Sequence, residues 1–96
     1  MTSKKQLQHE LQQALNRQDS HEVNRLIRKG ASINAINTDG NAPLHQCIID
    51  GNLEAVKLSV DHGADVSMAD GWNAVHIASF KGQRDIVNYL IMNHVR

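Results

Sequence analysis

Six histidines and one cysteine are the residues of this 96-residue sequence that could carry metal or nucleophile chemistry. Four of the histidines stand alone: His9, His21, His62 and His94. None of them has a histidine four residues away or a cysteine ligand nearby, so their spacing predicts no zinc site. Cys47 and His45 are two residues apart and would point to different faces of a helix, which argues against a Cys-His pair. The sequence has no Gly-rich phosphate loop, no Gly-x-Ser-x-Gly and no His-Glu-x-x-His. We therefore predict no enzymatic activity, no cofactor and no metal.

The charge balance limits the kinds of partner that the chain can bind. Lys and Arg together number 10, and so do Asp and Glu, which gives a formal net charge of zero. A domain with zero net charge has no overall basic surface that would bind nucleic acid or a membrane. This balance does not exclude a local basic patch. No stretch approaches the roughly 20 apolar residues of a membrane span, and a lone cysteine cannot form an internal disulfide. We predict a cytoplasmic protein, with the nucleus as an alternative, that binds neither nucleic acid nor membrane.

One sequence unit occurs three times along the chain. Asp39-Gly40 and Asp70-Gly71 are each followed five residues later by a histidine, at a spacing of 31 residues. Gly63-Ala64 repeats Gly30-Ala31 at a spacing of 33 residues. Internal repeats of this length are typical of solenoid proteins. We predict a single domain over 1–96 that contains three units, at about 2–36, 37–69 and 70–96.

Each unit has the pattern of two short helices. In the first unit, four apolar residues fall on one helical face: Leu7, Leu11, Ala14 and Leu15. Ser3 and Asp19 are placed to cap the two helices, with Gln6 and Glu22 three residues later as capping-box partners. Gly30 is expected to end the second helix, because glycine accepts the left-handed conformation found there.

The later units predict equivalent helices, near 43–49 and 53–61 and then near 74–80 and 84–93. Helices of this length are unstable alone, so stacking between units must stabilise them. The link 34–40 ends in Asp-Gly, a hairpin turn signal. Ser59 occupies a core position that Leu26 and Leu90 fill in the other units. We expect either a looser core there or a hydroxyl bonded back to its own helix.

These units resemble the ankyrin repeat family, whose pattern begins D-G-x-T-P-L-H-x-A-A. The middle unit carries Asp39-Gly40-Asn41-Ala42-Pro43-Leu44-His45, then Gly51-Asn52-Leu53-Glu54-Ala55-Val56-Lys57-Leu58 and Gly63-Ala64-Asp65-Val66. The resemblance implies an all-α ankyrin-repeat solenoid of three helix-turn-helix units with short β-hairpin-like turns. It also implies a structural role for His45 and His76, whose rings would bond the backbone of the turn. Cys47 would be a buried, inert thiol at a small core position.

The family resemblance also predicts which residues contact a partner. Ankyrin proteins bind through a concave surface of turn tips and exposed first-helix residues. Carried onto this sequence, the contact positions are Asn16, Arg17, Thr38, Asp39, Asn41, Ile49, Asp50, Trp72, Phe80 and Lys81. The equivalents Asn16, Ile49 and Phe80 should form one row across the stack, and Arg17, Asp50 and Lys81 a second row beside it.

Two aromatic residues of this set are candidate anchors. Trp72 follows a turn glycine and Phe80 precedes Lys81-Gly82 at a predicted helix end, so neither belongs to an apolar stripe. Large aromatic side chains on a rim are typical anchors of protein interfaces. The alternatives are that Trp72 lies flat against its short turn and that Phe80 is partly buried under the adjacent turn.

We interpret the chain as a non-enzymatic adaptor or inhibitor that binds another protein. The segment 44–52 with Gly71-Trp72 resembles ankyrin segments of protein phosphatase regulatory and targeting subunits. Those proteins also carry a basic-Val-x-Phe docking segment, which this sequence lacks. Ankyrin inhibitors of kinases or transcription factors are similar in size, so a phosphatase, a kinase or a transcription factor fits as partner.

The alternative function is a self-associating structural module. No polar capping unit follows the third unit, so we expect its last helix to be uncovered. Its apolar residues could pack against a second copy to form a homodimer: Ile86, Val87, Tyr89, Leu90, Ile91 and Met92.

Overall fold

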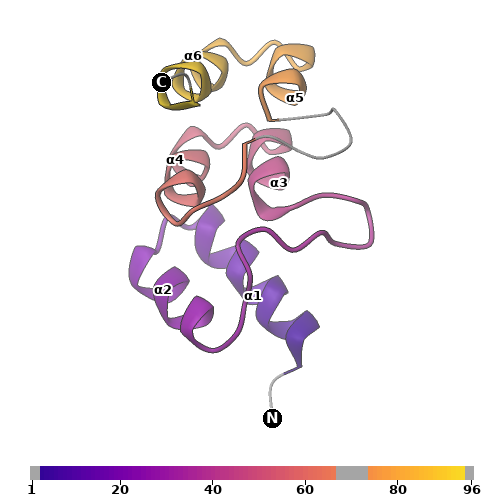
Figure 1. The fold of residues 1–96 in the computed structure, drawn as a ribbon, viewed down its shortest axis with the longest axis vertical. Helices are drawn as coiled ribbons and strands as arrows, with labels where there is room; N and C mark the ends of the chain where they lie inside the picture. Colours follow the sequence, from indigo (N-terminus) through magenta and orange to yellow (C-terminus); the bar gives the residue numbers. More distant parts are fainter. Residues whose placement is uncertain (1–2, 67–73, 95–96) are drawn as a thin grey trace.

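The computed structural model describes residues 3–66 and 74–94 and shows three stacked helix pairs (Figure 1). The helices are α1 (Lys4–Asn16), α2 (Ser20–Arg28), α3 (Pro43–Ile49), α4 (Leu53–Asp61), α5 (Ala74–Phe80) and α6 (Arg84–His94). The first helices of the pairs, α1, α3 and α5, pack on one another in one layer, and α2, α4 and α6 form the other layer. The described residues contain no strand. The predicted all-α fold is confirmed.

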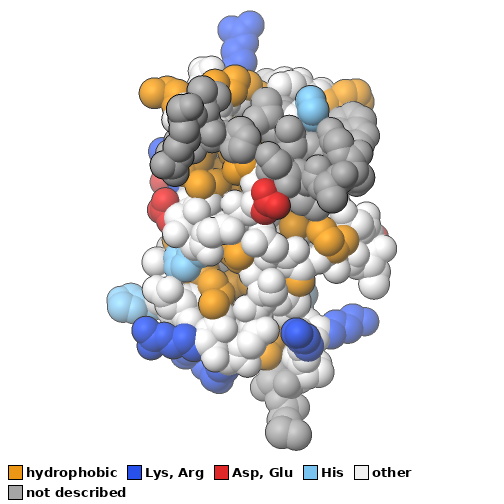
Figure 2. Space-filling view, viewed as in Figure 1, with side chains coloured by type: hydrophobic (Ala, Val, Ile, Leu, Met, Phe, Trp, Pro, Cys, Tyr) orange, Lys and Arg blue, Asp and Glu red, His pale blue; other side chains and the backbone are white. Residues whose placement is uncertain are grey.

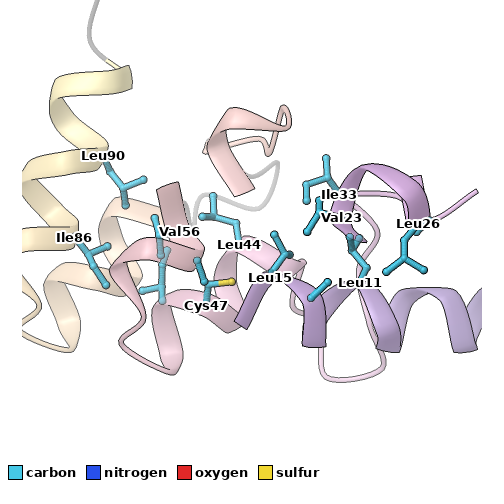
Figure 3. Packing of buried hydrophobic residues seen from close by; sticks show 14 of the residues in the cluster. Leu11, Leu15, Val23, Leu26, Ile33, Leu44, Cys47, Val56, Ile86 and Leu90 are labelled. Atoms are coloured by element: carbon cyan, nitrogen blue, oxygen red, sulfur yellow. The ribbon is translucent and has the colours of Figure 1, made fainter. Parts of the chain in front are cut away.

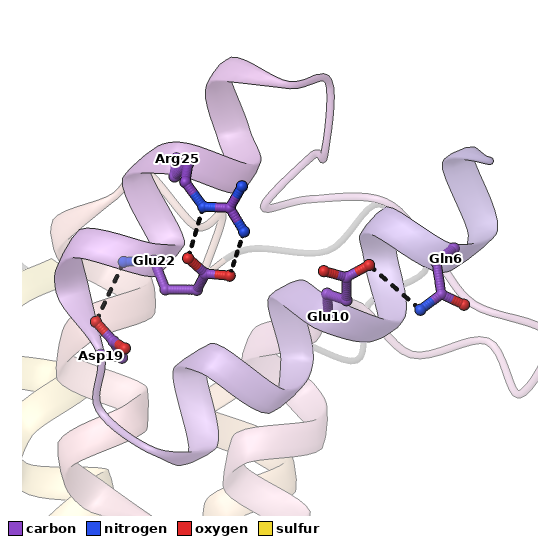
Figure 4. Close-up of polar contacts among 5 residues, drawn as sticks. All are labelled: Gln6, Glu10, Asp19, Glu22 and Arg25. Carbon is purple, nitrogen blue, oxygen red and sulfur yellow. Dashed lines mark hydrogen bonds and ion pairs between the residues drawn. The ribbon is translucent and has the colours of Figure 1, made fainter. Parts of the chain in front are cut away.

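Side chains cap the N-terminal ends of α1 and α2, and Figure 4 shows the cap at α2. The Ser3 hydroxyl accepts the backbone N–H of Gln6 at 3.1 Å, and the Asp19 carboxylate accepts that of Glu22 at 3.2 Å. The reciprocal half of the predicted capping boxes is not formed, because the Gln6 side chain bonds Glu10 and the Glu22 side chain bonds Arg25. Both N-caps are therefore confirmed as single hydrogen bonds.

The link between the first two units folds around Asn37. Its carbonyl accepts the N–H of Gly40 at 3.0 Å, and its own N–H donates to the carbonyl of Asn41 at 2.9 Å. Its side-chain oxygen accepts the N–H groups of Asp39 and Asn41 at 2.9 and 3.0 Å. Gly40 has a φ of 83°, which a residue with a side chain rarely adopts. The Asp-Gly turn is therefore closed as predicted.

One hydrophobic core runs through all three units (Figure 3). Leu11 and Leu44, which are equivalent in the repeat, are both buried. Ser59 is fully buried, and its hydroxyl donates to the carbonyl of Ala55 at 2.9 Å, as the second alternative predicted. Cys47 is buried beside it, with 3.7 Å between Sγ and the Ser59 Oγ. Burial raises the pKa of the Cys47 thiol.

The last helix gives most of its apolar side chains to this core. Ile86 and Leu90 are buried, and Val87 and Tyr89 pack against the core in part. Only Ile91 and Met92 of the predicted self-association set are exposed, at 44% and 80%. Ile86 and Leu90 are therefore not available to a second copy, because α6 packs against α4 and α5 along its inner face, and the predicted self-association could use only Ile91 and Met92 of that set as exposed residues.

Across the described ranges, no helix combines the length and the apolar character needed to span a membrane.

Candidate protein-binding surface

The predicted first row lies at the C-terminal ends of the first helices. Asn16, Ile49 and Phe80 are the last residues of α1, α3 and α5, which contact one another in that order. The side chain of Phe80 is 84% exposed and Ile49 is 37% exposed. The alternative that Phe80 is partly buried under a turn is therefore wrong. Trp72, the other aromatic candidate, lies outside the described residues.

The second row follows directly after these helix ends. Arg17, Asp50 and Lys81 are exposed at equivalent positions of the three units. Asp50 accepts a hydrogen bond from the Gln46 side chain at 3.2 Å, while no ion pair joins the described members of the row. The row therefore presents alternating charge next to the apolar residues Ile49 and Phe80.

A cleft of about 530 Å³ lies between α1 and the loop that precedes α3. Thr38 and Asn41 of the predicted contact set line it, but Asp39 does not. The other lining residues are outside the predicted contact set: Lys5, Gln8, His9, Gln12, Ala35, Ile36, Asn37, Pro43 and Gln46. The lining residues of the first helix lie N-terminal to Asn16 and Arg17, the contact positions predicted in that unit.

This side of the cleft exists because α1 is unusually long for its unit. It has 13 residues, whereas the equivalent helix α3 has 7. At the repeat spacing of 33 residues, the segment 4–9 corresponds to 37–42, which forms the turn in the middle unit. The first unit is thus helical where the second unit has a turn. The signal for this was present in Leu7, which continues the apolar stripe of Leu11 by one turn.

Side chains of α1 hold the loop in place. The Gln8 amide bonds both the carbonyl and the N–H of Ser32, the former at 2.9 Å. The Gln12 amide reaches the Cys47 sulfur at 3.5 Å in the next unit. By contrast, Lys5, His9 and the side chain of Asn41 make no hydrogen bond or ion pair within the described ranges. These groups line the cleft and are free to bind a ligand.

The charges of the chain are segregated although they cancel overall. The first unit, 2–36, has six Lys and Arg residues and three Asp and Glu residues, whereas the middle unit, 37–69, has one and five. Figure 2 shows Lys and Arg side chains gathered around the first helix pair. No Asp or Glu is among the residues that line the cleft. The cleft therefore lies where the basic first unit meets the acidic middle unit, and Lys5 is the only Lys, Arg, Asp or Glu among its lining residues.

The predicted bond from the ring to the turn backbone is confirmed for His45, and the equivalent bond of His76 stays a prediction. His45 is buried, and its Nδ1 accepts the backbone N–H of Ala42 at 3.3 Å, a structural bond across the start of α3. His76 is exposed in the third unit. The described residues contain no group of His, Cys, Asp or Glu side chains that could hold a metal ion.

Comparison with known families agrees with this architecture. The model for ankyrin repeats in three copies matches residues 11–96, so the match begins just after the extra turns of α1. The chain belongs to the ankyrin repeat family. It is a protein-interaction module of that family, and its architecture is the ankyrin solenoid that the sequence predicted.

Several curated relatives are similar over most of this chain. It is 44% identical to the human Notch-regulated ankyrin repeat-containing protein over 92 residues, which cover 90% of this chain and 81% of the relative. The zebrafish protein B of the same name is 45% identical over 86 residues, covering 83% and 78%. Mouse protein phosphatase 1 regulatory subunit 27 is 45% identical over 76 residues, which cover 76% of this chain but only 49% of the relative. The resemblance to phosphatase regulatory subunits is thus confirmed.

Proposed function

We propose that this protein is an adaptor or inhibitor that binds a partner protein through its concave surface. We define that surface as the cleft and the two rows at the ends of the first helices. The observation that carries the proposal is the exposure of Phe80 beside Ile49, because aromatic and aliphatic side chains that project from a rigid scaffold anchor protein interfaces. The relatives include a protein named as a phosphatase regulatory subunit, which supports a regulatory role.

We propose three alternative classes for the partner protein. A phosphatase, a kinase or a transcription factor would each be regulated by a small module that covers part of its surface. The rows offer apolar anchors flanked by Asp50 and Lys81, so the partner patch should be apolar with charges of both signs at its edge. The proposed role requires neither a cofactor nor a catalytic group.

The test is affinity capture from cells of the source organism followed by direct binding to the purified partner. The double variant Ile49→Ala/Phe80→Ala should weaken binding at least tenfold, since interface anchors commonly contribute about 2 kcal/mol or more. Both side chains are exposed, so the fold should persist, as checked by circular dichroism and thermal unfolding. Met92→Ala is the matched control, because Met92 is equally exposed but lies on α6. Unchanged binding by the double variant would refute the proposal.

Self-association is the second candidate function. It is favoured by the exposure of Ile91 and Met92 near the C-terminal end of the stack. Sedimentation or light scattering across a concentration series should then show a dimer that Met92→Glu dissociates. A monomer at all concentrations would exclude this function and leave the first untouched.

A further inference from the structure

We propose that the cleft between α1 and the loop 35–41 binds an extended, acidic segment of the partner that inserts an apolar side chain. This inference rests on the proposed function, because it assigns chemistry to one part of the concave surface. It differs from the row at the helix ends in its residues, its charge and its shape. It therefore can be tested with variants that leave Ile49 and Phe80 in place.

The floor of the cleft provides a site for an apolar side chain. Ile36 is 51% exposed although it is a large aliphatic residue, and Ala35 and Pro43 line the same cleft. An apolar group placed there would remove both itself and Ile36 from water, which stabilises binding in proportion to the area buried. The volume of about 530 Å³ lies in the range of ligand-sized clefts and fits a few peptide residues.

The charges around the cleft select for an acidic segment. Lys5 lines it and has no carboxylate partner within the described chain. Glu10, the nearest acid along α1, is bonded to Gln6 on another face of that helix. Among the described residues, Lys5 is the only Lys, Arg, Asp or Glu that lines the cleft, and Asp39 of the loop lies outside its lining, so an acidic segment would meet a cation there and a basic segment would meet like charge.

The polar groups of the cleft favour an extended segment over a helix. Thr38 and Asn41 line it with a hydroxyl and an amide that both donate and accept hydrogen bonds, and Gln46 adds its amide oxygen as an acceptor, since its amide nitrogen bonds Asp50. An extended peptide presents unpaired N–H and C=O groups that such side chains can satisfy, whereas a helix bonds its own backbone. The side-chain amide of Gln8 already bonds Ser32, so it stabilises one side of the cleft and is not available to the ligand.

The experiment is selection of random peptides displayed on phage against the full chain. Peptides enriched by the native chain should carry Asp or Glu next to an apolar residue. Synthetic copies should bind with chemical shift changes at Gln12, Ile36 and Asn41 and none at Arg28, which lies outside the cleft. No enrichment, or enrichment without acidic residues, would overturn the inference.

Charge reversal gives the sharper comparison. Lys5→Glu should weaken the selected acidic peptide about three- to tenfold, the size expected when an exposed ion pair becomes a like-charge pair. Lys4→Glu is the matched control, because Lys4 changes the net charge equally and sits on the same helix but does not line the cleft. Equal losses of peptide affinity in the two variants would show that the net charge of the chain weakens binding, and would refute a site at the cleft.

The apolar part is tested separately. Ile36→Ser should weaken the same peptide, whereas Ile91→Ser, at a similarly exposed isoleucine on α6, should not. The proposed function fails by a different result, namely unchanged partner binding by Ile49→Ala/Phe80→Ala. If that pair of substitutions abolishes partner binding while Lys5→Glu and Ile36→Ser leave the peptide unaffected, the rows bind the partner and the cleft does not.

Discussion

The first and middle units share a core but differ in almost everything that faces water. Leu11 and Leu44 are buried at equivalent positions, so the stacking contact repeats from unit to unit. The first helix has 13 residues in one unit and 7 in the other, and the Lys and Arg excess of the first unit becomes an Asp and Glu excess in the second. The repeat therefore constrains the interface between units, while the ends and edges of each helix are free to build a binding surface.

The largest expected difference between the units lies at one core position. Leu26→Ala should lower the free energy of unfolding by about 2–5 kcal/mol, because it leaves a cavity at a fully buried site. Ser59→Ala, at the equivalent position, should change it by less than about 1 kcal/mol, because only the hydroxyl bond to Ala55 is lost. Denaturant unfolding measures both values. Similar costs would mean that Ser59 contributes to stability in some way other than the hydrogen bond and the packing described here.

The helix caps should differ by a smaller amount. Asp19→Ala removes one capping bond and should cost about 1 kcal/mol. Asn52→Ala removes the equivalent cap and also the bond from its amide to the carbonyl of Asn16 at 3.1 Å, so it should cost about 2 kcal/mol. Urea unfolding with an unchanged m-value tests this order. Equal losses in the two variants would mean that the hydrogen bond from Asn52 to the Asn16 carbonyl contributes nothing to the free energy of unfolding.

Substitutions in the turn between the paired helices should change the stability in opposite directions in the first and middle units. Gln18 has a φ of 62° where Gly51 has 70°. A residue with a side chain is strained in this conformation by about 1–2 kcal/mol, so Gln18→Gly should stabilise the protein by about 0.5–1 kcal/mol after the entropy of glycine is subtracted. Gly51→Ala should destabilise it. Thermal unfolding of both variants gives the signs, and a loss of stability in Gln18→Gly would contradict the argument.

The smallest expected effect concerns pH. Arg25 binds the Glu22 carboxylate through two hydrogen bonds of 2.7 and 2.6 Å and thereby lowers the pKa of Glu22 below its ordinary value. A carboxylate whose pKa is lowered on folding stabilises the protein at pH values above the ordinary pKa of a glutamate. This stabilisation is lost as the pH falls through the pKa of the folded state. Arg25→Gln should return the Glu22 pKa toward its ordinary value. The protein should then lose less stability as the pH falls.

The control for that titration is on the same helix. Arg28→Gln removes the same charge, but Arg28 is not among the cations that act on Glu22. NMR titration of the Glu22 side chain should therefore show a raised pKa in Arg25→Gln and the native value in Arg28→Gln. The pair in the middle unit, Lys57 and Glu54, is a single contact at 3.5 Å and offers no comparable bidentate bond.

Much of the fold could be predicted because the repeat is periodic. The expected ranges 43–49 and 53–61 agree with α3 and α4, and α6 extends one residue beyond the expected 93. The buried face of α1 follows directly from the spacing of Leu7, Leu11, Ala14 and Leu15. The exposure of Phe80 was one of two alternatives that the sequence left open, and the structure decided between them.

Less of the candidate site could be predicted. The family pattern selected Thr38 and Asn41 but omitted Lys5, His9 and Ile36, which line the cleft with them. These residues lie on the segment of α1 that has no counterpart in the repeat and on the loop that packs against it. Their proximity depends on the bond between Gln8 and Ser32, which are 24 residues apart. No local pattern encodes such a contact.

The sequence by itself determined the helices, their caps and the face that each one buries, because these depend on hydrogen bonds and apolar spacing within a few residues. It also determined that charges cancel over the whole chain. Only the tertiary structure decided where those charges gather and that α1 and the loop 35–41 enclose a cleft. The physical reason is that stacking brings together surfaces from different units, and their complementarity appears only once the units are packed.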